Sequence, residues 1–220
     1  MMREDYEKLY LGVVYDAIIF DLKYDREFVV DNTIQNITST GTFFGRAFTC
    51  LGNEVETPDD IDDMVRIDMF KEFFNNSIQV IDTSSNTSVA HFGDISGKLA
   101  KKFGSSAVVV DGYTRDVDII SQDGYSVFCK GATPIDAYGK WQIVDYKCDI
   151  KLPSMNGGTI ELNADDYIFA DGDGVLVIHS EIVEDVKSLA QKRLKSEDHV
   201  RREVQKTNDI VSLYNRIGRW

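Results

Sequence analysis

An arginine and an aspartate stand side by side after an apolar run, in the segment VVVDGYTRDVDII (108–120). The guanidinium of Arg115 can grip a carboxylate or a carbonyl oxygen, and Asp116 can ligate a hard cation such as Mg²⁺. Loops at strand ends often carry binding and catalytic groups. Taken alone, however, the pair is more typical of an exposed ion pair, which is common and weak.

A second segment, HFGDISGK (91–98), places an aspartate where a glycine turn leads into a predicted helix. The free N–H groups and the dipole of such a helix start favour anionic oxygens, so a carboxylate ligand would lie beside Asp94. In the alternative interpretation, Asp94 only caps the helix. The local pattern favours the cap.

Other motifs of catalysis are missing from the sequence. The three histidines, His91, His179 and His199, form no HExxH pattern, and scattered structural histidines are the better interpretation. No GxSxG, GxGxxG or Walker pattern occurs. The acidic stretch ADGDGVLV (170–177) fails as a calcium loop because an oxygen ligand and a glycine are needed where Val175 and Leu176 stand. A turn between two strands is expected there, while a Cys–His nucleophile stays open.

The elements that must position these groups follow from hydrophobic periodicity and turn residues. Helices and strands alternate in the first half, the second half is rich in short strands, and the end is helical. This order predicts one α/β core with a C-terminal helical arm. The expected helices cover 5–24, 57–74, 93–104 and 181–220, and the expected strands cover 41–52, 77–84, 106–112, 125–131, 141–152, 158–162 and 166–179.

Bulk composition limits the partners and the location. A net charge of −13 disfavours nucleic acid, because binding rests on neutralising phosphates. Apolar runs are too short for a membrane span, and the first twenty residues lack the pattern of a signal peptide. The cysteines, Cys50, Cys129 and Cys148, are odd in number and widely spaced, which is typical of a reducing compartment. We therefore expect a cytoplasmic protein that binds neither nucleic acid nor membranes.

Considered together, the two segments form a D-x20-R-D spacing from Asp94 to Arg115 and Asp116, with VVDG before the pair. In this the chain resembles the RraA-like family. That family includes metal-dependent 4-hydroxy-4-methyl-2-oxoglutarate/4-carboxy-4-hydroxy-2-oxoadipate aldolases and the RraA regulators of ribonuclease E. The stretches YLGVVYDAI, GTFFGRAFTC and DYIFADGDGVLVI add to the resemblance, which covers roughly residues 10 to 180. It implies an α/β fold of the swivelling β/β/α kind.

The resemblance also implies roles for matching residues. Asp116 would be the direct protein ligand of Mg²⁺ or Mn²⁺, and Arg115 would hold the keto oxygen and stabilise the enolate. Asp94 would position a water on the metal for proton transfer. Backbone N–H groups of Gly93, Asp94, Ile95 and Ser96 would bind the substrate carboxylate. A chain with three histidines suits this chemistry, which needs neither a histidine nor a Schiff-base lysine.

The resemblance to the family also implies an oligomer with active sites at the subunit interfaces. We expect an RraA-like domain over 1–180 and the arm over 181–220. The arm resembles that of aldolase-type members, in which an acidic residue from a neighbouring subunit completes the metal's water shell. Glu197 is the candidate here, with Asp198 next, although an exposed acid on a helix is an equally good interpretation. A homotrimer or hexamer is expected.

The resemblance implies a divalent-metal-dependent aldolase or lyase that cleaves a 4-hydroxy-2-oxo acid to pyruvate, with oxaloacetate decarboxylation as a side activity. A small 2-oxo acid is the expected partner. The alternative is a protein-binding regulator of ribonuclease E, and a weaker one is an enzyme of sugar-acid or cell-surface biosynthesis with another 2-oxo substrate. Tyr113 and Thr114 stand where the family has small residues, so we expect them to narrow the pocket or shift its preference.

Overall fold

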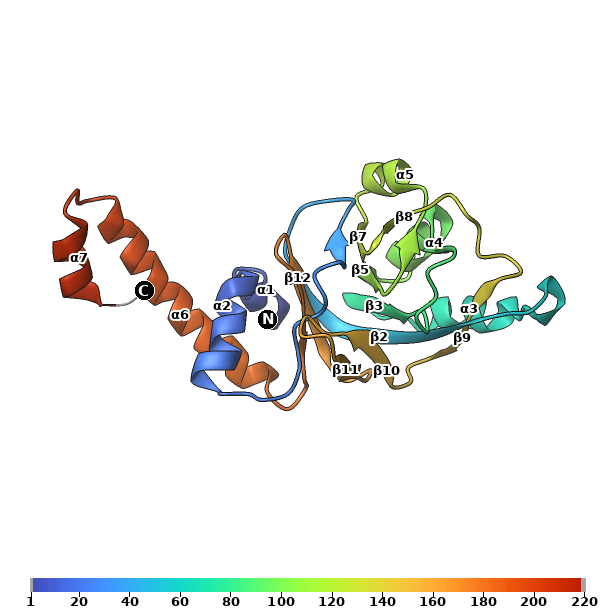
Figure 1. Ribbon diagram of the computed structural model, residues 1–220, viewed down its shortest axis with the longest axis horizontal. Coiled ribbons are helices and arrows are strands. Elements are labelled where there is room, and N and C mark those ends of the chain that lie inside the picture. Colours follow the sequence, from blue (N-terminus) through green and yellow to red (C-terminus); the bar gives the residue numbers. More distant parts are fainter. Residues whose placement is uncertain (1, 219–220) are drawn as a thin grey trace.

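The computed structural model describes residues 2–218 and shows an α/β body from which a helical arm projects (Figure 1). The arm consists of α6 (Val183–Val204) and α7 (Ile210–Ile217). The N-terminal helices α1 (Met2–Tyr6) and α2 (Leu11–Asp16), with a π-helical turn at Ala17–Asp21, pack against the base of α6 and the edge of the sheet. The predicted α/β core and helical arm are therefore confirmed. Arg219 and Trp220, at the end of the predicted arm, lie outside the described residues.

The body is built on one large sheet whose strand order is β1-β7-β5-β3-β2-β12-β13, with β9 also paired to β2. Neighbouring strands from β7 to β2 run parallel, as expected for strands joined by helices. The strands are β1 (Gln35–Asn36), β2 (Phe43–Glu54), β3 (Ser77–Asp82), β5 (Ser105–Val110), β7 (Ser126–Cys129), β9 (Trp141–Tyr146), β12 (Tyr167–Asp171) and β13 (Gly174–Ile178).

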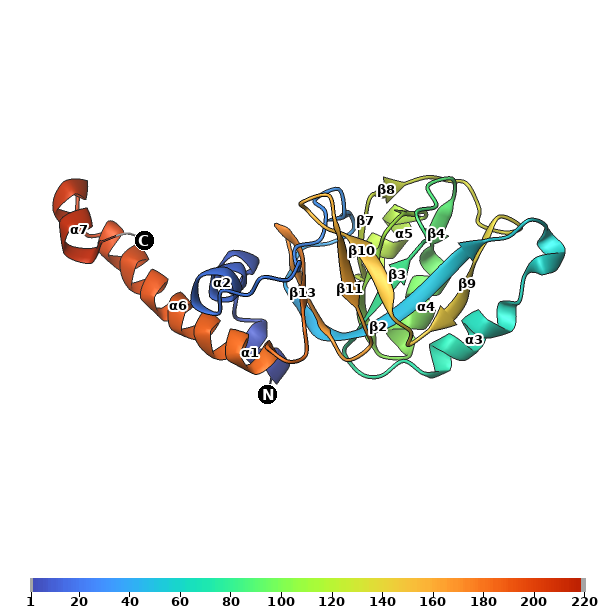
Figure 2. The same cartoon turned by 60° about the horizontal axis from the view of Figure 1, so that its bottom comes forward.

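Successive side chains of β3 point to opposite faces of this sheet, so each face of the sheet has its own part of the hydrophobic core. Ile78 and Val80 face the hairpin of β10 (Ile150–Pro153) and β11 (Thr159–Leu162), which lies across one face (Figure 2). Ile81 belongs to the other face, under α3 (Asp63–Lys71) and α4 (Asp94–Lys102). The central strands are thus buried on both faces of the sheet, as their unbroken apolar runs predict.

A second, three-stranded sheet lies beyond the carboxyl ends of the central strands. Its members are β4 (Ala90–Phe92), β6 (Tyr113–Thr114) and β8 (Gly131–Ala132), all parallel. The last two follow β5 and β7 after turns of two residues and one residue. Two residues, Arg115 and Asp116, separate β6 from helix α5 (Val117–Gln122). This small sheet carries both charged segments singled out in the sequence.

Several predicted elements are divided in the structure. The expected strand over 125–131 becomes β7 and β8 in different sheets, and the expected helix over 181–220 becomes α6 and α7. The expected strand over 141–152 is two strands in different sheets, because the chain turns at Lys147, whose φ is +57°. The expected helix over 57–74 begins with a separate 3-10 turn, Pro58–Asp60, closed by mutual hydrogen bonds of Thr57 and Asp60. Helix α3 then starts anew after Asp62, which caps it. No helix among residues 2–218 is long and apolar enough to cross a membrane.

Candidate active site

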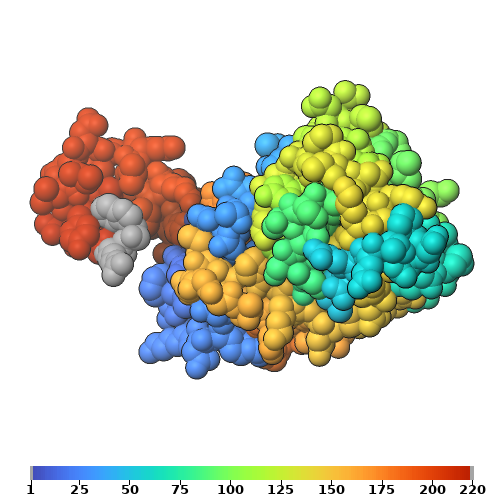
Figure 3. All heavy atoms as spheres, turned by 45° about the vertical axis from the view of Figure 1, so that its right-hand side comes forward, coloured from blue at the N-terminus to red at the C-terminus, as the bar shows by residue number. Residues whose placement is uncertain are grey.

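A cleft of about 440 Å³ lies between α3, the starts of α4 and α5, and the segment leading into β9. Figure 3 shows the cyan residues around α3 beside the yellow residues that precede β9, on the face in view. All the residues predicted to bind substrate line this cleft, as does the predicted metal ligand. They are Gly93, Asp94, Ile95, Ser96, Arg115 and Asp116.

The two charged segments meet because β4 and β6 are parallel neighbours. Phe92 pairs with Thr114, so the residues that follow, Gly93 and Arg115, lie side by side at the same ends of the strands. The N–H of Arg115 donates to the carbonyl of Phe92 at 2.9 Å, and the hydroxyl of Thr114 donates to the same oxygen at 3.0 Å. Twenty residues of separation in the sequence therefore become direct contact in the fold.

The start of α4 points its backbone toward Asp116. Gly93 is the N-cap and Asp94 the first helical residue, so Asp94 does not cap the helix. The N–H of Asp94 donates to Oδ2 of Asp116 at 3.3 Å. The N–H groups of Ile95 and Ser96 belong to the same first turn, whose donors have no partner within the helix. A ligand carboxylate in the cleft can accept hydrogen bonds from them.

Asp116 has an unusual backbone conformation for an aspartate. Its φ of 61° and ψ of 32° lie in the left-handed region, and its carbonyl accepts the N–H groups of Ile119 and Ile120 at the start of α5. Asparagine and aspartate tolerate this conformation better than most residues. The resulting turn directs the carboxylate back toward Arg115, whose Nε lies 3.4 Å from Oδ2 of Asp116.

Sequence reasoning missed the main partner of Arg115. Nη1 of Arg115 donates to Oδ2 of Asp136 at 2.7 Å, from the loop between β8 and β9. A hydrogen bond from the N–H of Tyr138, together with the guanidinium of Arg115, lowers the pKa of Asp136 below its usual value. The sequence does not indicate that Asp136 lies near Arg115, because Asp136 is in a loop without hydrophobic periodicity.

Lys98 holds the carboxylate of Asp94 from one turn further along α4. Nζ of Lys98 lies 3.1 Å from Oδ2 of Asp94 and 2.6 Å from Oδ2 of Asp123. The hydrogen bond from Lys98 lowers the pKa of Asp94. Asp94 therefore stays negatively charged, which suits a group that orients a water through hydrogen bonds.

Tyr113 and Thr114 do not narrow the cleft, so the expected narrowing is wrong, whereas the expected shift in substrate preference stays a prediction. Neither residue lines it, and Thr114 is fully buried behind the strand ends.

His91 is held by hydrogen bonds within the protein. The N–H of Tyr113 donates to Nδ1 of His91 at 3.2 Å, and Nε2 of His91 lies 3.0 Å from Oδ1 of Asn86. Burial lowers the pKa of His91 to about 4, so its ring is neutral at pH 7; His91 also lines the cleft, and its structural role stays a prediction.

The cleft carries more negative than positive charge. Two arginines line it, Arg66 and Arg115, and each is paired with an aspartate of the cleft. Five lining aspartates, Asp62, Asp63, Asp94, Asp116 and Asp136, leave three negative charges in excess. Carboxylate oxygens in this number suit a hard divalent cation such as Mg²⁺ or Mn²⁺. Gly93 adds to the fit, because a Cβ there would lie only 3.0 Å from Oδ2 of Asp116.

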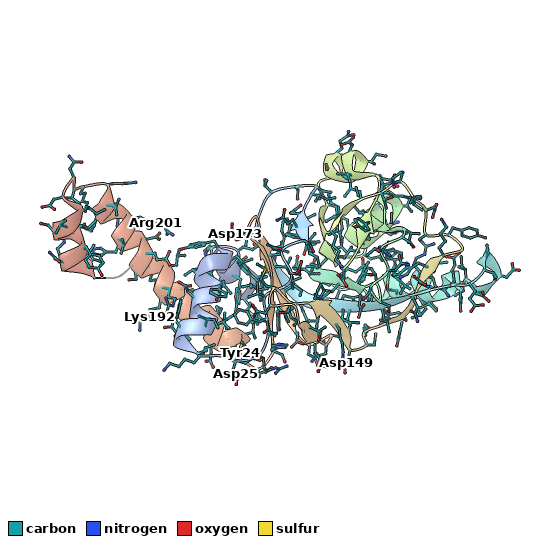
Figure 4. The ribbon with its side chains drawn as sticks, viewed as in Figure 1. Tyr24, Asp25, Asp149, Asp173, Lys192 and Arg201 are labelled. Atoms are coloured by element: carbon teal, nitrogen blue, oxygen red, sulfur yellow. The ribbon has the colours of Figure 1, made fainter. Side chains whose placement is uncertain are left out.

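Glu197, the other predicted metal ligand, is not part of this cleft within one chain. It lies on α6, in the arm, where its carboxylate accepts hydrogen bonds from the hydroxyl of Tyr10 and from Arg201. Figure 4 labels Arg201 on the arm, at the opposite end of the molecule from α4 and α5. Only another subunit could bring a Glu197 side chain to this cleft.

A second group of potential metal ligands lies at the base of the arm. Side chains of Asp166, His179 and Glu181 have ligand atoms within 4.8 Å of one another. Their oxygens already have partners: Asp166 accepts the N–H of Ser180 at 2.9 Å, and Glu181 accepts the hydroxyl of Tyr24 (labelled in Figure 4) at 2.9 Å. This arrangement is complete as a hydrogen-bonded link between the hairpin and the arm.

These features define an α/β protein with a polar cleft at the ends of parallel strands, the usual place for ligands in such sheets. The chain belongs to the RraA-like family. The family model described as RraA-like, Aldolase/RraA matches residues 13–177. The predicted family and the predicted RraA-like α/β fold are therefore confirmed.

Curated relatives of this chain carry two kinds of name. Protein DlpA of Legionella pneumophila subsp. pneumophila is 34% identical over 128 residues, 55% of this chain and 20% of DlpA. The "Putative 4-hydroxy-4-methyl-2-oxoglutarate aldolase 3" of Arabidopsis thaliana is 30% identical over 48% of this chain and 60% of that protein. A protein of the same aldolase name from Hahella chejuensis is 26% identical over 68% and 83%. The chain thus spans less than two thirds of the first two relatives.

Solved structures share the fold over most of the chain. A protein described among novel cellulases from microbes associated with the gut ecosystem is 25% identical, with a TM-score of 0.81 over 90% of this chain and 86% of that one. RraAS2 of Streptomyces coelicolor is described as an unusual member of the RNase ES inhibitor RraA protein family. It is 18% identical, with a TM-score of 0.73 over 91% and 95%.

Proposed function

We propose that this chain is a divalent-metal-dependent lyase of the class II aldolase type that cleaves a 4-hydroxy-2-oxo acid to pyruvate. One observation carries the proposal: Arg115, Asp116 and the start of α4 converge in a single cleft. A 2-oxo acid needs donors for its carboxylate and positive charge where the enolate oxygen develops. Oxaloacetate decarboxylation is the expected side activity, because it passes through the same pyruvate enolate.

The metal would be Mg²⁺ or Mn²⁺, held directly by Asp116 and, through water, by Asp94. One carboxylate with several waters is a usual environment for Mg²⁺. When bound, the ion supplies Lewis-acid stabilisation of the negative charge on the 2-oxo oxygen.

The side chains of the cleft divide the remaining work. The N–H groups of Ile95 and Ser96 bind the carboxylate of the substrate, and Arg115 donates to its 2-oxo oxygen. Asp94, ionised because Lys98 lies 3.1 Å away, accepts the proton of the C4 hydroxyl through water. The C3–C4 bond then breaks, C4 becomes a carbonyl, and the electron pair of the broken bond forms the pyruvate enolate. Return of the proton from Asp94, through water, to C3 of the enolate gives pyruvate.

The names of the relatives from Arabidopsis thaliana and Hahella chejuensis support this class of reaction. The decisive test is a coupled pyruvate assay on purified protein across oxaloacetate and 4-hydroxy-2-oxo acids, with and without EDTA. Pyruvate release that EDTA abolishes and Mg²⁺ or Mn²⁺ restores is the expected result. Turnover that is indifferent to EDTA contradicts metal dependence, and no release from any of these acids contradicts the lyase.

We also propose a homo-oligomer, a trimer or hexamer, in which Glu197 of one subunit serves the cleft of another. The projecting arm and its exposed Val204, Ile210 and Val211 support this proposal (Figure 1). Co-expression tests it: D116N and E197Q subunits, each inactive alone, should regain activity when mixed within one oligomer. Mixed oligomers without activity would show that Glu197 does not act across subunits.

A cytoplasmic location, with no nucleic-acid partner, is part of the proposal. Cys50, Cys129 and Cys148 are all unpaired, which suits a reducing compartment. Fractionation of cells with an antibody against the chain tests the location. Filter binding with RNA at low salt tests the partner, and retention of RNA there would contradict the proposal.

The second candidate is a protein-binding regulator of ribonuclease E. The fold shared with RraAS2 is compatible with it, but the conjunction of Asp94, Arg115 and Asp116 favours the lyase. Pull-down of purified ribonuclease E separates the two functions. Binding with no lyase turnover would support the regulator, and turnover without binding would support the enzyme.

A further inference from the structure

One polar side chain on the inner wall of the cleft has no use in the chemistry described above. Gln79 lies in the middle of β3, on the same face as Ile81, and both residues line the cleft. Its neighbours across the strands are Phe48 and Val108. Only 1% of Gln79 is exposed, so this carboxamide is buried where an apolar residue would be the ordinary choice.

The amide of Gln79 is only half satisfied. Nε2 lies 3.6 Å from Sγ of Cys50 and 3.6 Å from Sδ of Met69, which are weak partners. Oε1 has no hydrogen-bond partner among the described residues, and it is shielded from solvent. Rotating the amide by half a turn would place its oxygen near the thiol of Cys50 and leave the NH₂ group unpaired instead. In either orientation one end of the amide stays unsatisfied beside the cleft.

An unsatisfied buried polar group costs on the order of 1–3 kcal/mol, so such groups in native proteins call for an explanation. Ser77, two residues earlier on the same strand, is also buried with an unpaired hydroxyl, but it does not line the cleft. Gln79 therefore differs from Ser77 because the side chain of Gln79 forms part of the cleft wall. A ligand that fills the inner cleft would supply the missing partner.

Charge limits what that ligand carries. Both lining arginines are already paired, Arg66 with Asp63 at 3.0 Å and Arg115 with Asp136 at 2.7 Å. Of the three negative charges in excess among the lining residues, Lys98 offsets one at Asp94, and a divalent ion would neutralise the other two. Several apolar lining residues belong to the same core cluster as Phe48 and Val108, the neighbours of Gln79 across the strands; they are Met69, Phe70, Ile81, Phe92 and Ile143. A second carboxylate would meet no unpaired cation on this wall and would be costly to bury there.

We propose that Gln79 is a specificity-determining residue that hydrogen-bonds an uncharged hydroxyl or carbonyl group of the substrate half that leaves with C4. The inference rests on the proposed lyase function. It narrows the substrate to a 4-hydroxy-2-oxo monocarboxylate bearing further hydroxyl groups, as in a 3-deoxy-2-oxo sugar acid. A hydroxyl suits both orientations of the amide, because it donates and accepts. The dicarboxylate in the names of the relatives would be the poorer substrate.

The experiment compares wild-type protein, Gln79→Leu and the matched control Ser77→Ala. Each is assayed for kcat and KM on a 3-deoxy-2-oxo sugar acid, on 4-hydroxy-4-methyl-2-oxoglutarate and on oxaloacetate. We expect wild-type kcat/KM to be higher for the sugar acid than for the dicarboxylate. Gln79→Leu should lower kcat/KM for the sugar acid roughly tenfold relative to oxaloacetate, mainly through KM. Ser77→Ala should leave the ratio unchanged.

Folding is checked by the urea midpoint, which Gln79→Leu should raise because it removes an unsatisfied group. If Leu disrupts the strand, Gln79→Met, of similar length, replaces it. A wild-type enzyme that prefers the dicarboxylate, or an unchanged substrate ratio in both Gln79 variants, would overturn the inference.

Failure of the proposed function gives a different result. In that case no 2-oxo acid yields pyruvate with wild-type protein. Isothermal titration with the intact sugar acid and Mg²⁺ then decides the inference about Gln79. Roughly tenfold weaker binding to Gln79→Leu than to wild type supports it, and equal or undetectable binding to both contradicts it.

Discussion

The backbone N–H of Asp94 donates to the carboxylate of Asp116 over 3.3 Å, across twenty-two positions of sequence. This contact joins the start of α4 to the left-handed turn before α5. It brings the positive end of one helix, a carboxylate and, through Arg115 at 3.4 Å, a guanidinium into one place.

Asp116→Asn should abolish metal binding while keeping the fold. Asparagine accepts the left-handed backbone that Asp116 adopts, but it removes the charge that a hard cation requires. We expect activity and Mn²⁺ affinity to fall roughly a hundredfold or more. Mn²⁺ titration followed by electron paramagnetic resonance measures the affinity, with circular dichroism as the control for folding. Unchanged Mn²⁺ affinity would remove Asp116 from the metal site.

Asp136→Asn should reduce catalysis because Asp136 holds the guanidinium of Arg115 at 2.7 Å. We expect kcat/KM to fall roughly tenfold, against roughly a hundredfold for Arg115→Lys, which loses the forked donor itself. The matched control is Asp165→Asn, which breaks the exposed Arg46 pair of the same length, 2.7 Å. Equal effects of Asp136→Asn and Asp165→Asn on steady-state kinetics would contradict a positioning role.

Gly93→Ala should impair the site only by steric crowding. The φ of Gly93 is −155°, which any residue adopts, but an added Cβ would lie 3.0 Å from Asp116 Oδ2 and 3.3 Å from Arg115 Cγ. We expect a roughly tenfold or greater loss of kcat/KM with a nearly unchanged urea midpoint. Gly158→Ala, whose Cβ would meet nothing within 4 Å, is the control and should behave like wild type. A fully active Gly93→Ala enzyme would rule out this crowding.

The free energy of unfolding should decrease as the pH is lowered, because His91 is buried in its neutral form. Burial lowers its pKa from 6.5 to about 4, so the unfolded chain binds a proton at a higher pH than the folded one. The stability is complete above pH 6.5 and is lost as the pH falls from 6.5 toward 4, by about 2 kcal/mol at pH 5. His91→Gln should lack this part of the loss. Urea unfolding at pH 7.5 and pH 5 measures it, and parallel losses in both proteins would refute the assignment.

The exposed apolar residues of the arm should hold subunits together. Ile210 and Val211 are 67% and 66% exposed in the single chain. The double change Ile210→Asp and Val211→Asp should shift the protein to smaller species in light scattering after size exclusion. Lys192→Glu, which alters the charge of the arm by the same two units at an exposed position, is the control. Identical masses for all three proteins would place the contacts between subunits elsewhere.

Local sequence determined much of the scaffold and the identity of the central residues. Apolar runs marked β3, β5 and β7, and the glycine turn at Gly93 marked the start of α4, because hydrophobic period and turn chemistry act over a few residues. The resemblance carried by Asp94, Arg115 and Asp116 supplied the candidate roles. The fold then placed all three in one cleft.

Tertiary structure alone decided which distant groups became partners. The pairing of Arg115 with Asp136, the half-satisfied amide of Gln79 and the contact of Glu197 with Tyr10 all depend on how distant segments pack together. No local period encodes those contacts, because their free energy comes from groups that meet only after the sheet has formed. The sequence therefore determined which chemical groups are available, and the parallel pairing of β4 with β6 decided where they act together.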